Sequence, residues 1–131
     1  MSLMTSERAG IVKALNTAQI SSVLYAKEAV PASYPAAIVV LATEEGTKAT
    51  AMRFMDTELS WSVYLVISAL NNGDPDKDAY DLKEAFRAAL VTEIGKDVGF
   101  VEYYNSQCDG RPVRVARMDI VKARGREVNN G

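Results

Sequence analysis

The sequence of 131 residues contains no histidine and a single cysteine. Histidine is the commonest general base and the commonest zinc ligand, so its absence excludes the catalytic triads and zinc sites that depend on it. With one cysteine the chain cannot form an internal disulfide, which is typical of proteins in a reducing compartment. These two absences remove the usual starting points for an enzyme or a metalloprotein.

The chain also lacks a long apolar run and an excess of positive charge. No apolar run reaches the roughly 18 residues of a membrane-spanning helix, and the N-terminus lacks the basic and apolar regions of a signal peptide. The formal net charge is -2 and the pI about 5.2, whereas domains that bind duplex DNA normally carry a strong positive excess. We therefore expect neither a membrane nor a specific nucleic acid as a partner.

Three patterns remain as candidates for chemistry, and the sequence favours none of them. Cys108 lies beside Asp109, whose charge opposes the electropositive setting that a reactive thiolate needs. Glu44 and Glu45 are adjacent at a strand end, so they point to opposite faces. The stretch DPDKD, residues 74–78, has aspartates at alternate positions but lacks the glycine and the glutamate of a calcium loop. We expect no catalytic residue, no cofactor and no metal.

What is present indicates a globular domain. Apolar residues make up 48% and charged residues 24% of the chain, close to the averages for globular proteins. This length suits one core, so we expect residues 1–131 to form a single domain. Residues 1–3, ahead of Met4, are expected to be a remnant of expression, and residues 124–131 a polar C-terminal tail.

The first half of the chain predicts one helix followed by strands. Thr5 or Ser6 is expected to cap a helix whose apolar stripe is narrow. A short strand is expected within SSVLYAKEAV, and the apolar run AAIVVLAT, residues 36–43, predicts the next. EEGTK then has the composition of a turn, ATAMRF that of a third strand, and MDTE that of a hairpin connection. These strands are expected to form an antiparallel meander.

The second half predicts a stronger helix and a closing pair of strands. Asp74 is a suitable N-cap, with Pro75 at the first helical position and Gly95 at the C-terminal cap. Apolar residues at helical spacing follow, and Lys83, with Glu84 and Arg87, is expected on the opposite side. VGFVEYY predicts a strand, NSQCDG a turn and RPVRVARMDIVKA a last strand.

The predicted fold class is therefore α+β, a mainly antiparallel sheet with one long helix packed on one face and a short N-terminal helix. The stretch ELSWSVYLVISAL, residues 58–70, raises a question about the other face. It begins by alternating apolar and polar residues and then becomes apolar on both sides from Tyr64 to Ile67. The short first helix is expected to cover only part of the second face. An exposed apolar sheet face marks an interaction surface, and a second subunit is the simplest cover.

The order and spacing of the segments resemble the tail terminator and tail completion proteins of long-tailed bacteriophages and prophages. The similar stretches are spread from Thr5 to Arg124, and we quote them in chain order: IVKALNTA, YPAAIVVLA, WSVYLVISAL, DLKEAFRAAL and GRPVRVARMDIVKAR. The resemblance implies a structural protein of virion assembly that forms a homo-oligomeric ring, typically a hexamer. Such a ring caps the tail tube and joins it to the head connector.

The same resemblance implies the partners and the location. The partners would be copies of the chain itself, the tail tube protein and the head connector proteins. The protein would be assembled in the host bacterial cytoplasm and end in the virion tail. An acidic chain also suits a lumen through which a genome passes without sticking.

We predict interface residues from the strands that carry the unsheltered apolar surface. Trp61 is as well explained by the core as by an interface. The arginines of the set are expected to act as ion-pair donors. The set comprises Met55, Trp61, Tyr64, Val66, Arg111 and Arg114.

Three alternatives remain open at the level of sequence. One is a head-side neck or connector adaptor, which shares this architecture. Another is a dimeric ferredoxin-like module whose sheet faces pair around a small molecule. The third is a hydrolase or isomerase that uses carboxylates in place of histidine, which needs two facing acidic side chains across a pocket.

Overall fold

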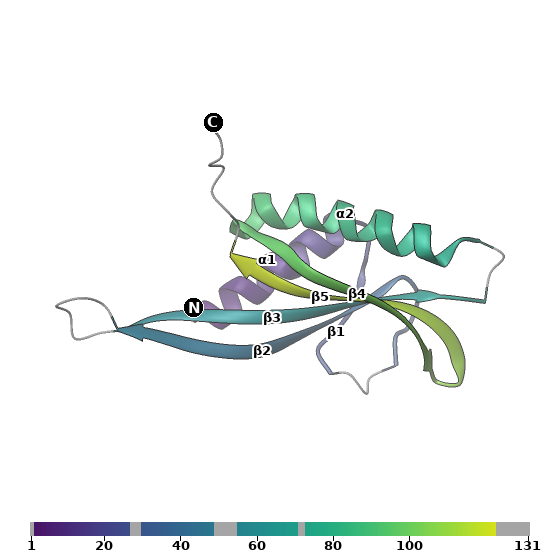
Figure 1. Ribbon diagram of the computed structural model, residues 1–131, viewed down its shortest axis with the longest axis horizontal. Coiled ribbons are helices and arrows are strands. Elements are labelled where there is room, and N and C mark those ends of the chain that lie inside the picture. Colours follow the sequence, from purple (N-terminus) through teal and green to yellow (C-terminus); the bar gives the residue numbers. More distant parts are fainter. Residues whose placement is uncertain (1, 27–29, 49–54, 71–72, 123–131) are drawn as a thin grey trace.

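The computed structural model describes residues 2–26, 30–48, 55–70 and 73–122, and for residues 46–48 and 55–57 it describes the backbone alone. The five strands form one sheet in the order β1-β2-β3-β5-β4, with two helices (Figure 1). The predicted α+β class with a mainly antiparallel sheet is confirmed. The elements are α1 (Leu3–Thr17), β1 (Ser22–Leu24), β2 (Ala36–Lys48), β3 (Met55–Ser68), α2 (Pro75–Ile94), β4 (Lys96–Cys108) and β5 (Arg111–Lys122).

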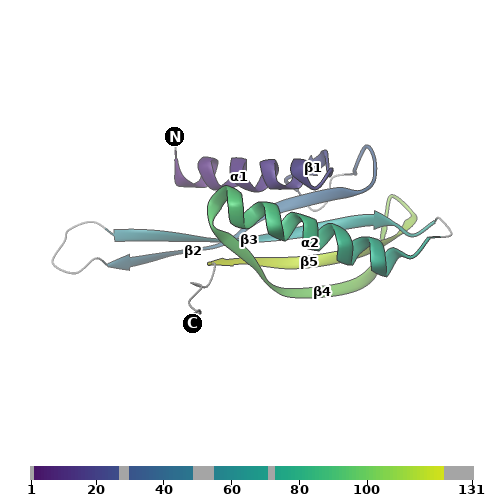
Figure 2. The same cartoon turned by 90° about the horizontal axis from the view of Figure 1, so that it is seen from above.

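Both helices lie on the same face of the sheet (Figures 1 and 2). α2 packs over β3, β5 and β4, and α1 lies beside α2. Alternate residues of β3, the central strand, point into this layer, because successive side chains of a strand face opposite sides. The β3 residues in the core under the helices are Leu59, Trp61, Val63, Leu65 and Ile67.

The first helix begins earlier than the sequence predicts. Ser2 is its N-cap, and the Ser2 hydroxyl accepts a hydrogen bond from the Thr5 backbone N–H at 3.1 Å. The predicted caps at Thr5 or Ser6 are therefore wrong, and residues 2 and 3 contribute to the fold although we predicted a remnant. The weak stripe of α1 is held by the sheet through Ile11, Ala14 and Leu15, which are fully buried.

The second helix has the predicted ends. Asp74 caps it by accepting from the Lys77 backbone N–H at 3.2 Å, Pro75 begins it, and Gly95 ends it in the left-handed region with φ 65°. The prediction that Lys83 faces outward is wrong, because its side chain is buried. The Lys83 stem follows the core face of α2, and its ammonium lies 4.0 Å from the centre of the Tyr80 ring.

The hairpin between β2 and β3 is longer than the sequence predicts. EEGTK continues β2 and MDTE begins β3, so neither is a turn. Their backbones pair from Glu44 with Leu59 to Lys48 with Met55. The predicted strand ATAMRF, residues 49–54, lies outside the described residues. A polar two-stranded ribbon and a turn contain the same types of residue. The sequence therefore predicts the connection at the wrong place.

Two further strand predictions need correction. β1 pairs with β2 in parallel, from Ser22 with Ala36 to Leu24 with Ile38, so the first strands are not an antiparallel meander. NSQC extends β4, and the turn before β5 consists of Asp109 and Gly110. Both of these residues have positive φ, which Asp tolerates and Gly favours.

We expect Gly10→Leu to destabilise the protein, because α1 packs closely against the end of α2 there. A Cβ atom at residue 10 overlaps the Cγ2 methyl of Ile94. The expected loss of unfolding free energy in urea is about 1–3 kcal/mol, as for other overpacked contacts. Ala9→Leu, on the exposed side of the same helix, is the matched control. Equal stability of the two variants contradicts this helix contact.

Candidate assembly surface

The side of the sheet away from the helices has no second layer among the described elements, and we call it the open face. Its residues are set by the register: Ile38 of β2 lies opposite Tyr64 of β3, and Tyr64 lies opposite Arg117 of β5. The next row joins Ala36, Val66, Val115 and Tyr104 across four strands. The open face is therefore mainly apolar over β2 and β3 and carries the charged Arg117 on β5.

The chain covers one end of this face with its own residues. Val66 is 5% exposed and Val115 5%, although no helix lies over them. Pro31 and Tyr34, from the connection between β1 and β2, lie over this end; Pro31 is buried and Tyr34 packs against the same cluster. The predicted interface role of Val66 is thus corrected: it has almost no surface to offer a partner.

The rest of the open face is only partly exposed. Tyr64 and Tyr104 are half-buried, and with Pro31 they line a pocket of about 210 Å³ whose floor includes Val66 and Val115. That volume is below the 300–1,000 Å³ of most small-molecule sites. It is closer to the size of one anchoring side chain than to that of a cofactor.

Phe100 and Val121 form the exposed apolar end of this face, and the sequence reasoning missed both. Phe100 is 63% exposed and Val121 43% exposed. Their strand neighbours Val101 and Ile120 pack under the helices, so alternation places Phe100 and Val121 on the open face. The bulge in β4 between Val98 and Val101 disturbs the alternation, and no sequence pattern revealed it.

Next to the apolar residues of the open face, one arginine is paired with two carboxylates. The guanidinium of Arg117 lies 3.2 Å from a carboxylate oxygen of Glu102 and 3.5 Å from one of Asp119. The three side chains are partly exposed. A partner that covers them meets paired charges, which cost less to desolvate than isolated ones.

The other predicted interface residues lie in four different settings. Trp61 is 1% exposed and its Nε1 donates to Glu7 at 2.9 Å, so it belongs to the core, and its interface assignment is corrected. Arg114 is already paired within the chain, with Asp76 at 2.7 Å. Arg111 is exposed at the start of β5. Met55 begins β3, and its side chain lies outside the described residues. Among the members of the set whose side chains are described, Tyr64 is the one that lies on the partly exposed apolar surface.

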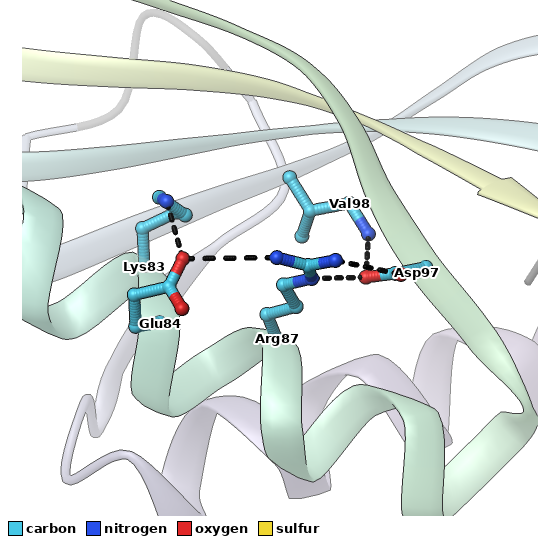
Figure 3. A network of polar contacts seen from close by, with 5 residues as sticks. All are labelled: Lys83, Glu84, Arg87, Asp97 and Val98. Carbon is cyan, nitrogen blue, oxygen red and sulfur yellow. Dashed lines mark hydrogen bonds and ion pairs between the residues drawn. The ribbon is translucent and has the colours of Figure 1, made fainter.

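The start of β4 is fixed to α2 by a network of charges (Figure 3). Arg87 of α2 donates two hydrogen bonds to the carboxylate of Asp97, at 2.7 Å and 3.2 Å. Glu84 lies between Lys83 and Arg87 and pairs with both. Burial acts to raise the pKa of Asp97, but the hydrogen bonds from Arg87 and from the Val98 N–H outweigh it and leave this pKa below its usual value.

Tyr34 and the acidic side chains are the groups to compare with the predicted chemical sites. A hydrogen bond with the Cys108 thiol raises the pKa of the Tyr34 hydroxyl, which makes Tyr34 a weaker acid rather than a base. No group of three or more cysteine, aspartate or glutamate side chains in the described part could hold a metal ion. Neither described helix is long and apolar enough to cross a membrane.

Comparison with protein-family models finds no match, and a comparison with curated proteins finds no similar sequence.

The Arg87–Asp97 pair predicts a pH dependence of stability. Because the pKa of Asp97 is lower in the folded state, its contribution is present above about pH 4, the unfolded value, and is lost as the pH falls through the folded value. We expect Asp97→Asn to lower the unfolding free energy by about 1 kcal/mol or less, since Arg87 is half exposed.

Urea unfolding of both proteins at a series of pH values measures this difference. It should be constant from about pH 5 to pH 8 and shrink below about pH 4. Asp81→Asn, which removes an exposed pair with Lys77, is the control. A difference that stays constant down to about pH 3 contradicts the depressed pKa.

Proposed function

We propose that this chain is a structural subunit of virion assembly that forms a ring with copies of itself. Within that class we propose a tail terminator or tail completion protein, which caps the tail tube and joins it to the head connector. The observation that carries the proposal is the one-sided sheet: both helices cover one face, and Phe100, Val121 and Tyr64 remain on the other.

The edges of the sheet support the same proposal. β1 covers β2 only at Ala36–Ile38, which leaves β2 from Val39 to Lys48 without an outer neighbour among the described strands. β4 is the opposite edge of the sheet. Two long edges on opposite sides, with an apolar face between them, suit a contact that repeats head to tail. A repeated contact of this kind closes into a ring when the rotation allows.

A dimeric small-molecule module remains the second candidate, because the open face carries a pocket. Native mass measurement separates the two. A stable dimer that retains a small molecule favours the module, whereas a ring of more than two subunits favours the assembly subunit.

The head-side neck adaptor differs from the terminator in the effect of its loss. Without a terminator, tubes grow to unregulated length. Without an adaptor, tails of normal length stay separate from heads.

We expect the Phe100→Glu and Tyr64→Glu variants to fold normally but to assemble poorly. Phe100 is exposed and Tyr64 half-buried, so a new charge there changes the unfolding free energy by about 1 kcal/mol or less. The same charge prevents burial of the open face in an assembly. Circular dichroism and sedimentation, alone and with tail tubes, measure folding and assembly.

Two further variants serve as controls, one at a buried position and one at an exposed position. Val66→Glu should lower the unfolding free energy by about 3 kcal/mol or more, because it buries a charge without a partner. Val91→Glu, on the outer surface of α2 with 44% exposure, should leave folding and assembly unchanged. Normal assembly of both open-face variants overturns the proposed role of this face.

A further inference from the structure

The hairpin of β2 and β3 extends past the rest of the sheet (Figures 1 and 2). We call its described part, residues 43–48 and 55–60, the arm. The arm pairs β2 with β3, but the pairing of β3 with β5 begins only at Trp61 with Ile120. A hairpin of two strands without a third strand or an apolar face is marginally stable. A contact with another surface would therefore stabilise the arm.

The arm is also acidic. Glu44, Glu45 and Glu58 are exposed, and Glu45 lies directly opposite Glu58 across the ladder. Like charges in that position destabilise a strand pair. No ion pair joins these three glutamates to a cation within the described part of the chain. A basic surface on another molecule would relieve this repulsion.

Lys122 and Lys96, which we call the basic corner, lie at the same end of the sheet as the arm but toward its other edge. Lys122 ends β5 and lies opposite Lys96, the first residue of β4. The Lys96 side chain is 12% exposed, and its ammonium lies 3.3 Å from a carboxylate oxygen of Glu7 and donates to the Leu59 carbonyl at 3.1 Å. Lys122 is exposed, so it is the lysine that this corner presents to a neighbour. Leu59 is the partner of Glu44. One row across the sheet therefore has a glutamate at the β2 end and lysines at the β4 end.

The directions of the strands make these two corners complementary between copies. β2, β3, β5 and β4 reverse direction at each step, so β2 and β4 run antiparallel. When copies stand side by side in the same orientation, β2 of one lies next to β4 of the other in the antiparallel sense. The same arrangement brings the acidic arm of one copy to the basic corner of the next.

We propose that the arm of one copy docks beside the start of β4 of a second copy, where Glu44 faces Lys122 and Glu45 adds negative charge on the other face of the arm. The contact is made by charge rather than by a continued ladder. Both edges carry bulges, and the Asp97 carboxylate already accepts the Val98 N–H at 2.7 Å. The proposal rests on the proposed function and names the lateral contact of its ring.

A charge swap between copies tests the docking. We expect Glu44→Lys with Glu45→Lys to weaken self-association about tenfold, and Lys122→Glu to do the same, as reversed pairs do at charged interfaces. Mixing the two variants should restore association to within about threefold of the unaltered protein, because each arm then meets a corner of opposite sign. Sedimentation of the separate and mixed proteins at low and high salt gives the constants. Asp81→Lys, on the exposed surface of α2, is the control.

The outcomes separate the two proposals. If the unaltered protein assembles but the separate variants assemble equally well, or the mixture is not rescued, the arm contact is wrong and the ring stands. If one chain that carries all three substitutions recovers while the mixture does not, the pairing is within a chain and the docking is wrong. If the unaltered protein never self-associates, alone or on tail tubes, both proposals fall.

Discussion

The burial of alternate β3 residues under both helices is the interaction on which the rest of the structure depends. β3 lies at the centre of the sheet, and Leu59, Trp61 and Val63 are each 4% exposed or less. Each such side chain contributes about 1.5–3 kcal/mol when it is fully buried. Because α1 and α2 both pack on this one face, no described helix covers the other. The open face follows from how the core is built.

That constraint connects the fold to assembly. The chain covers part of the open face with Pro31 and Tyr34, next to which Val66 and Val115 are buried. Phe100 and Val121 stay uncovered. The apolar surface that remains exposed is small. In the proposed contact, the arm and the basic corner add charge to it. In the proposed ring, apolar burial would give affinity, and charge pairing would give register and direction.

The sequence predicts the features that depend on local chemistry and misses those that depend on distant contacts. Asp74, Pro75 and Gly95 set the ends of α2 through their own backbone preferences, so they were predictable. Lys83 was misplaced because only the packed helix shows that its stem follows the core face of α2. The polar stretches at 44–48 and 55–58 were taken for turns, since their pairing partners lie across a hairpin. Tyr64 was recognised on the candidate surface, whereas Phe100 depended on a bulge that leaves no pattern in the sequence.

Amide hydrogen exchange at low and high protein concentration tests the central claim most directly, that copies of the chain complete the open side of the sheet. We expect that a higher concentration, or the presence of tail tubes, protects the amides of β4 and those of β2 from Val39 to Lys48, because a neighbouring copy excludes water from these edges. The outer surface of α2 should exchange at the same rate throughout. Exchange that is identical under all these conditions, or protection gained on α2 instead, would contradict it.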